Sequence, residues 1–224
     1  MMAVVILAGG EGRRIGGGKP LRTLAGKTLL EHALAIARQW SPLIGISVRD
    51  AASAFHSTGA LFLPDTAASG PIAGIASALA FGRTNGVSRV LTIPCDTPFL
   101  PSDMSNRLDV ALVPHAGAVI AASGGRWHPS CGLWRVETEA ALALYLASGR
   151  RSLTGFAEAL GAVAVEWPVA PVDPFFNINS ATDLDEAEAL IMKPRAGKIY
   201  SAGPHDPLQT SCGLSPPRRG PAPI

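Results

Sequence analysis

The sequence predicts an α/β fold, with a mostly parallel but mixed sheet covered by helices on both faces. Short apolar runs with the length of buried strands alternate along the chain with segments of helical periodicity. A Gly-Gly pair near the middle of the chain indicates one antiparallel hairpin within this pattern. The length of 224 residues suits one domain with a sizeable core.

Six apolar runs are expected to be strands, and four segments with helical periodicity lie between or after them. We expect strands at 3–7, 43–48, 60–63, 90–93, 118–122 and 162–167, and helices at 28–40, 71–82, 137–148 and 152–160. Gly124-Gly125 predicts a turn from the fifth strand into a strand at 128–136, which makes the sheet mixed.

A last helix is expected to begin near Ser180, because Ser180 and Asp183 have the spacing of a capping box. Beyond it, residues 194–224 contain seven prolines and four glycines. This composition is typical of disordered segments, so we expect a domain at 1–193 and a disordered tail at 194–224. A basic recognition arm is the alternative for the tail.

Composition and charge exclude several classes of protein. A mean hydropathy of +0.25 with 47% hydrophobic residues is too apolar for a disordered chain, while charged residues interrupt every apolar run before it could span a membrane. The short first run lacks a basic segment before it, so we expect a cytoplasmic protein without a signal peptide. The three cysteines, Cys95, Cys131 and Cys212, lack C-x-x-C spacing.

Charge is unevenly distributed along the chain. The net charge is +2, but residues 193–224 contribute five basic residues and one acidic residue, so the first 192 residues carry −2. A nucleic-acid-binding domain usually clusters its basic residues on the domain itself. We therefore expect no nucleic-acid partner.

The segment from Leu7 to Lys19 predicts a phosphate-binding loop. It holds six glycines, two arginines and a lysine directly after the first apolar run. Glycines allow backbone N–H groups to approach an anion, and Arg and Lys add positive charge. A Walker A loop is excluded by Pro20, whereas a dinucleotide fingerprint is only disfavoured, by Ile15. A surface loop without a ligand is the alternative.

Asp96 is the expected metal ligand. It follows the run at 90–93, and the carboxyl edge of a parallel strand faces the same crevice as the glycine loop. Mg²⁺ is commonly held by one or two carboxylates together with phosphate oxygens. An Asp that caps the next helix is the alternative.

Asp65 is the candidate for base selection, because a carboxylate can accept two hydrogen bonds from the N1–H and N2–H₂ edge of guanine. Gly70 and Pro71 then begin a helix whose N-terminus can receive an anion. An Asx-turn at Asp65 is the alternative.

Two further polar groups could face the crevice. Asn177 and Asn179 are two residues apart, so extended backbone would point both amides the same way. His128 could help to position a substrate. The alternatives are a turn before the last helix for the two asparagines and a hydrogen-bonded structural histidine for His128.

Over residues 3–191 the chain resembles the molybdenum cofactor guanylyltransferases. The first matching segment begins with Leu7-Ala8-Gly9-Gly10 and continues, after three residues, with Arg14-Ile15-Gly16 and, after two more, with Lys19. Ile15 stands where the family usually has Met. Three further segments match: Pro-Cys-Asp-x-Pro around Asp96, Asp65 followed after five residues by Gly-Pro-x-x-Gly, and the Asn-x-Asn of Asn177 and Asn179 before the last helix. The strand that begins with His128-Pro129 also resembles a His-Pro strand of the family. The chain departs from the family at Ser47-Val48-Arg49, where an Asn is usual.

This resemblance implies a single Rossmann-like nucleotidyltransferase domain that transfers GMP from GTP to the phosphate of molybdopterin, with Mg²⁺ as cofactor. It implies catalytic roles for Arg14, Lys19 and Asp96, with Asp96 on the metal. The implied nucleotide-binding residues are Leu7, Ala8, Gly9, Gly10, Lys19, Ser47, Asp65, Gly70, Gly74 and Asp96. His128, Asn177 and Asn179 are the residues implied to contact the pterin or the ribose.

Other functions stay open at this point. A molybdopterin cytidylyltransferase would more often carry Leu-Ala-Ala-Gly, and a sugar-phosphate nucleotidyltransferase or a non-catalytic nucleotide-binding regulator are further alternatives. Other proteins that make or accept the cofactor are possible partners.

Overall fold

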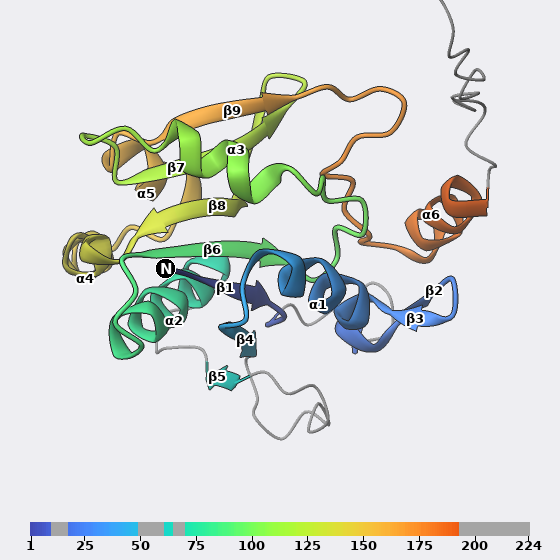
Figure 1. Cartoon of the computed structure of the whole chain (residues 1–224), viewed down its shortest axis with the longest axis horizontal. Helices are drawn as coiled ribbons and strands as arrows, with labels where there is room; N and C mark the ends of the chain where they lie inside the picture. Colours follow the sequence, from blue (N-terminus) through green and yellow to red (C-terminus); the bar gives the residue numbers. More distant parts are fainter. Residues whose placement is uncertain (10–17, 49–60, 65–69, 193–224) are drawn as a thin grey trace, which may run out of the picture. The chain divides into compact units, whose positions relative to one another are not determined.

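The computed structural model describes residues 1–9, 18–48, 61–64 and 70–192, within one compact unit, Met1–Lys193. Over these residues, seven strands form one sheet in the order β5-β4-β1-β6-β8-β7-β9 (Figure 1). The strands are β1 (Met2–Leu7), β4 (Ile44–Val48), β5 (Leu61–Pro64), β6 (Arg89–Pro94), β7 (Ala118–Ser123), β8 (Arg126–Arg135) and β9 (Val163–Trp167). The predicted mixed α/β sheet is confirmed.

The strand order reverses beside strand β1. The chain places β4 and β5 on one side of β1 and then returns to place β6 on its other side, with all four strands parallel. In open α/β sheets, ligands bind at the carboxyl ends of the strands next to such a reversal. The loops after β1 and β6 therefore meet at the place where a ligand site is expected.

Among the described strands of this sheet, β8 runs antiparallel to its neighbours, β6 and β7. The turn between β7 and β8 uses Gly124 and Gly125, whose φ angles of 55° and 73° suit a tight hairpin. The predicted Gly-Gly hairpin is confirmed. Further along, His128 pairs with Ala121 whereas Gly132 pairs with Ile120, so residues 129–131 form an irregular segment of β8.

In the described part of the chain, six α-helices connect or follow these strands. They are α1 (Leu29–Trp40), α2 (Pro71–Thr84), α3 (Met104–Ala111), α4 (Glu139–Ala147), α5 (Leu153–Ala159) and α6 (Ala181–Met192). Shorter elements are the 3₁₀ helices η2 (Lys19–Leu21) and η3 (Val136–Thr138) and a hairpin of β2 (Thr23–Leu24) with β3 (Lys27–Thr28).

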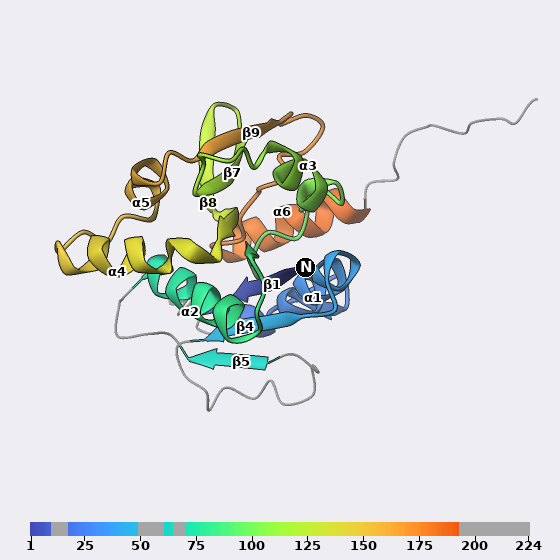
Figure 2. The same cartoon turned by 60° about the vertical axis from the view of Figure 1, so that its left-hand side comes forward.

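The helices cover both faces of the sheet, as predicted. Val4 and Ile6 of β1 belong to the buried cluster that includes residues of α1 and α3, whereas the alternate residues Ala3 and Val5 pack with residues of α2. Figure 2 shows α1, α3 and α6 on one side of the sheet and α2, α4 and α5 on the other. Side chains that alternate along a strand thus supply two cores.

α6 is attached to an early part of the chain by a small buried cluster. Leu24 of β2 and Leu29 of α1 pack with Ile178 and Ala187, and all four side chains are almost completely buried. This cluster brings the segment before α6 next to η2. The two elements together supply part of the site described below.

Helix α3, the 3₁₀ helix η2 and the hairpin of β2 with β3 were not predicted from the sequence. Helix α3 buries only Met104 and Leu108, one turn apart, so it lacks the repeated apolar pattern of a longer helix. The hairpin of β2 and β3 has two residues in each strand, and its turn contains Ala25 with a φ of 47° and Gly26 with a φ of 78°. Strands this short carry no detectable period.

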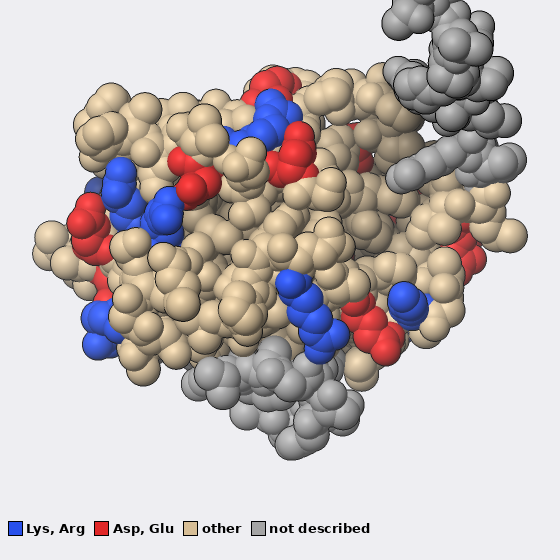
Figure 3. Space-filling view, in the orientation of Figure 1, with Lys and Arg blue, Asp and Glu red and all other residues tan. Residues whose placement is uncertain are grey.

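The surface mixes charges of both signs. On the face in Figure 3, Lys and Arg lie among Asp and Glu and a larger uncharged surface. Arg83 pairs with Glu139, and Arg89 pairs with Asp109. Within the described ranges, no helix is long and apolar enough to span a bilayer. The predicted tail at 194–224 lies outside the described residues, and the boundary at residue 193 stays a prediction.

We expect Thr28→Ala to destabilise the protein by about 1 kcal/mol, the usual effect of losing an N-cap. Thr28 and Glu31 form a capping box at the start of α1, in which Thr28 Oγ1 accepts from the Glu31 N–H at 3.1 Å. The hydrogen bond from the Thr28 N–H lowers the pKa of Glu31. The contribution of Glu31 is therefore present above its unfolded pKa and is lost as the pH falls through its lowered folded pKa.

Urea denaturation at neutral and acidic pH measures this effect. The matched control is Thr23→Ala, which removes the exposed partner of Thr28 in the same hairpin and should change stability by less than about 0.5 kcal/mol. Equal stabilities of the two variants would contradict the role of the capping box.

Candidate active site

A cavity of about 260 Å³ lies at the carboxyl ends of β1, β4 and β6, beside the reversal of strand order. The beginning of α2, the irregular part of β8 and the segment before α6 contribute its other walls. The lining residues are Leu7, Gly9, Lys19, Ser47, Gly70, Pro71, Gly74, Pro94, Cys95, Asp96, Ser130 and Asn177.

Backbone hydrogen bonds continue the sheet past the ends of its strands and form the base of this cavity. The Ala8 N–H donates to the Ser47 carbonyl at 2.8 Å, and the Cys95 N–H donates to the Leu7 carbonyl at 3.2 Å. The loops after the three strands are therefore held at fixed positions relative to one another. Because the Ala8 N–H already donates to Ser47, Ala8 would contact a nucleotide through its other atoms.

Glycine at position 74 allows α2 to pack closely against the cavity. A Cβ on Gly74 would lie 2.8 Å from Leu7 Cδ2 and 3.4 Å from Ser47 Oγ. Gly70 precedes the helix with a φ of 80°, and Pro71 occupies the first turn. Since Gly70 and Pro71 line the cavity, the N-terminal end of α2 faces it, in the orientation that favours anions.

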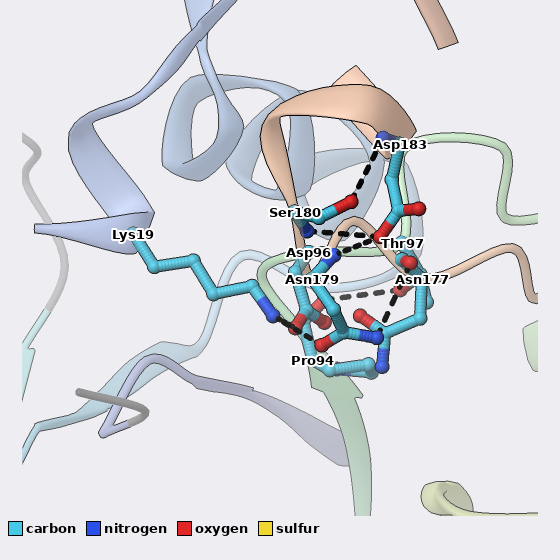
Figure 4. A network of polar contacts seen from close by, with 8 residues as sticks. All are labelled: Lys19, Pro94, Asp96, Thr97, Asn177, Asn179, Ser180 and Asp183. Atoms are coloured by element: carbon cyan, nitrogen blue, oxygen red, sulfur yellow. Dashed lines mark hydrogen bonds and ion pairs between the residues drawn. The ribbon is translucent and has the colours of Figure 1, made fainter. Parts of the chain in front are cut away.

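Lys19 reaches into the site from η2. Gly18 adopts a left-handed conformation with a φ of 60° directly before it, and Pro20 fixes the next backbone angle. The Lys19 side chain is about 10% exposed, and its ammonium forms an ion pair with Asp96 Oδ2 and donates to Asn179 Oδ1 at 2.9 Å (Figure 4). A buried ammonium is thus paired with one charged and one neutral acceptor.

Asp96 follows β6 and offers its second carboxylate oxygen to a further partner. Its main-chain carbonyl accepts from the Ile178 N–H at 3.0 Å, which fixes the residue against the segment before α6. Oδ1 is buried and has no hydrogen-bond partner among the residues that the structure describes. Leaving a buried carboxylate oxygen without a partner is costly, so this atom is well suited to accept a cation.

The segment before α6 is fixed by a capping box. Asp183 Oδ2 accepts from the Asn179 N–H at 2.7 Å and from the Ser180 N–H at 2.9 Å, while Ser180 Oγ accepts from the Asp183 N–H at 3.1 Å. The hydrogen bond from the Asn179 backbone, followed by those from Ser180, lowers the pKa of Asp183. The predicted box is confirmed, and it holds Asn179 in place beside Lys19 (Figure 4).

A divalent metal fits the donor set at Asp96 only if other molecules complete its coordination. No group of three or more His, Cys, Asp or Glu side chains that could hold a metal occurs in the described part of the chain. The unpartnered oxygen of Asp96 is a hard ligand of the kind that Mg²⁺ prefers. One carboxylate, with phosphate oxygens and water as the remaining ligands, is a common arrangement for that ion.

His128 lies beside the cavity lining and takes part in a separate polar cluster. Its Nε2 is 2.8 Å from Ser123 Oγ, which also donates to Asp173 Oδ1 at 2.9 Å, and its ring stacks on Phe175 at a centroid distance of 4.7 Å. Burial, more than the nearby Arg126, lowers the pKa of His128. The neighbouring Ser130 lines the cavity instead. A role for His128 towards a substrate stays a prediction.

The structure brings most of the predicted site residues to one cavity. Leu7, Gly9, Lys19, Ser47, Gly70, Gly74, Asp96 and Asn177 line it. Ala8 and Asn179 contact lining residues through their hydrogen bonds to Ser47 and Lys19. Gly10, Arg14 and Asp65 lie outside the described residues.

Sequence reasoning did not assign Pro94, Cys95 or Ser130 to the site, although all three line the cavity. It identified Asp183 as the capping partner of Ser180 but not as the residue that holds Asn179. All four lie within four residues of a predicted site residue, so adjacency was the available signal. The Cys95 thiol is buried, and this burial together with the charge of Asp96 raises its pKa, as suits a packing residue.

Comparison with known proteins places this geometry in a family. Residues 4–164 match the family described as the MobA-like NTP transferase domain. A molybdenum cofactor guanylyltransferase from Bradyrhizobium sp. (strain ORS 278) is 40% identical in an alignment 194 residues long, which covers 83% of this chain and 91% of the relative. Another, from Cereibacter sphaeroides (strain ATCC 17029 / ATH 2.4.9), is 37% identical over 84% of this chain and 96% of the relative.

Solved structures agree with these relatives. Molybdopterin-guanine dinucleotide biosynthesis protein A from Archaeoglobus fulgidus matches with a TM-score of 0.66 and 27% identity, over 86% of this chain and all of that chain. The 2-C-methyl-D-erythritol 4-phosphate cytidylyltransferase from Thermus thermophilus matches with a TM-score of 0.62 and 23% identity, over 84% and 97% of the two chains, and shares the fold. The chain therefore belongs to the MobA-like NTP transferase family, together with the molybdenum cofactor guanylyltransferases.

Proposed function

We propose that this protein transfers GMP from GTP to the terminal phosphate of molybdopterin, forming molybdopterin guanine dinucleotide and pyrophosphate. An oxygen of that phosphate attacks the α-phosphorus of GTP in line. A new P–O bond forms as the bond from the α-phosphorus to the bridging oxygen breaks, and pyrophosphate leaves with the electron pair. The attack is direct, so the step needs no protein nucleophile, and because a phosphate monoester is largely ionised near neutral pH it needs no general base either.

The contact between Lys19 and Asp96 at the strand-order reversal is the observation that carries this proposal. It places a positive and a negative side chain at the base of a cavity that is also faced by the N-terminus of α2. Lys19 would stabilise negative charge on the phosphates, a role that matters most where water is excluded. The relatives at 37–40% identity support the choice of guanine and of molybdopterin.

Asp96 would hold Mg²⁺ in this reaction through its unpartnered Oδ1. When bound, the ion supplies positive charge that neutralises the phosphate oxygens at the reacting centre. Arg14, which lies outside the described residues, is proposed to act with Lys19 on the same charge.

The pterin is proposed to contact Asn177, Asn179 and His128. Asn177 supports this assignment best, because it lines the cavity. Asn179 is engaged by the ammonium of Lys19 and His128 by Ser123, so these two would act mainly by orienting neighbours.

Two substitutions test the chemistry. Asp96→Asn should abolish most Mg²⁺-dependent transfer, and Lys19→Ala should reduce kcat by about 10²–10³-fold, the usual effect of removing a donor that stabilises developing charge. The assay follows pyrophosphate release from GTP in the presence of molybdopterin. Lys27→Ala removes the same charge from the exposed β3 strand and should leave the rate unchanged. A near-native rate in either site variant would remove that residue from the mechanism.

The choice of base tests the function as a whole. GTP should be preferred over CTP by more than the roughly 200-fold that a methylene-scale difference provides, because a site built for hydrogen bonds rejects a base that lacks them. Competition between GTP and CTP for transfer to molybdopterin measures this preference. A preference for CTP would instead assign a cytidylyltransferase.

Asp65→Ala should narrow the preference for GTP if Asp65 binds the guanine edge. Asp109→Ala, which removes an exposed carboxylate from α3, is the control and should leave the preference unchanged. If Asp65→Ala keeps the full preference, the base is selected by other residues while the function stands.

A further inference from the structure

Lys19 makes two contacts of different strength at the base of the cavity. Its ammonium pairs with the charged Asp96 Oδ2 and also donates to the neutral Asn179 Oδ1 at 2.9 Å. The two acceptors come from separate parts of the chain, the end of β6 and the segment before α6, and the ammonium contacts both (Figure 4). Two acceptors around one ammonium allow the side chain to give up one contact and keep the other.

The charges at Asp96 make such an exchange favourable when a second cation arrives. The side chains of Lys19 and Asp96 are largely buried, with exposed fractions of 10% and 13%. In such surroundings the carboxylate needs a positive partner, and Lys19 supplies it. A divalent ion on the same carboxylate would provide that charge and would repel the ammonium at short distance.

Asn179 is held in the position that such an exchange requires. Asp183 fixes its backbone through the 2.7 Å hydrogen bond, and its own Nδ2 donates to the Asn177 carbonyl at 3.4 Å, which turns Oδ1 towards Lys19. An amide oxygen accepts a hydrogen bond from an ammonium but competes weakly with a carboxylate for its charge. Asn179 is therefore an alternative acceptor that retains Lys19 inside the cavity.

We propose that Lys19 is an exchangeable counter-ion, which neutralises Asp96 until a divalent cation takes the carboxylate and is then retained by Asn179. The inference rests on the proposed function in that the cation site at Asp96 belongs to it. Two roles for one lysine follow from this exchange. It competes with the metal at Asp96, and once displaced it still presents a positive charge to the phosphates in the same cavity.

This exchange predicts opposite effects of two substitutions on metal binding. Lys19→Met removes the competitor and should tighten the binding of Mn²⁺ about tenfold, within the range usual for coupled sites. Asn179→Ala removes an acceptor that the ammonium contacts in both states but that matters more once the metal has taken Asp96, so it should weaken Mn²⁺ binding by up to about tenfold. In the double variant Asn179→Ala should have no further effect, because no ammonium is left to accommodate.

Titration with Mn²⁺, followed by electron paramagnetic resonance without nucleotide, measures these affinities in the full chain. Asp96→Asn identifies the signal of this site, since it should abolish it. Lys27→Met is the matched control, because it removes an equal charge from an exposed position and should change the affinity by less than about twofold. Lys19→Gln is a second variant that keeps a hydrogen-bond donor, and circular dichroism checks that each variant is folded.

Three results would overturn the inference. One is Mn²⁺ binding that is unchanged or weaker in both Lys19 variants. Another is weakening by Asn179→Ala that is equally large without Lys19, because Asn179 would then act only by supporting Asp96. The third is an absence of Mn²⁺ binding in all variants, including those that lack Lys19.

The proposed function is judged by a different measurement. Transfer of GMP from GTP with unaltered Mn²⁺ affinities in the Lys19 variants would keep the function and reject the exchange. The expected affinities without any transfer would keep the exchange and reject the function.

Discussion

The cavity depends on the backbone pairing that continues beyond the carboxyl end of β1. Strand β1 lies between two parallel neighbours, and the hydrogen bonds from Ala8 to Ser47 and from Cys95 to Leu7 extend this arrangement into the loops. Cys95 and Asp96 form the turn directly after β6, so the hydrogen bond at Cys95 fixes the backbone from which the next side chain, that of Asp96, projects. The position of the charged group follows from the pairing of the sheet.

A second constraint comes from apolar packing at the edge of the site. Burial of Leu24 and Leu29 against Ile178 and Ala187 attaches α6 to the hairpin that follows η2. Burying apolar side chains stabilises a fold roughly in proportion to their area, whereas burying an ion pair often yields little net stability. The apolar cluster therefore holds the polar groups of the site together more than the contact of Lys19 with Asp96 does.

The sequence predicted what depends on repeated local patterns. All six apolar runs overlap strands, and the box formed by Ser180 and Asp183 could be recognised because capping has a fixed spacing. Helix α3 was missed because two buried residues are too few to define a period. The contact between Lys19 and Asn179 could not be derived either, because no local rule relates side chains that meet only through the packing of distant segments.

The distance along the chain between the groups of the site also affects how the protein is made. Lys19 and Asn179 are separated by 160 positions, and chains fold from the amino end as the ribosome releases them. The segments that carry Lys19 and Asp96 are thus synthesised well before the segment that supplies Asn179 and α6. The entropy lost on closing so long a loop grows only slowly with its length. The delay before Asn179 can contact Lys19 is therefore set more by the time needed for translation than by the cost of closing the loop. Completion of the cavity is thereby tied to synthesis of nearly the whole domain.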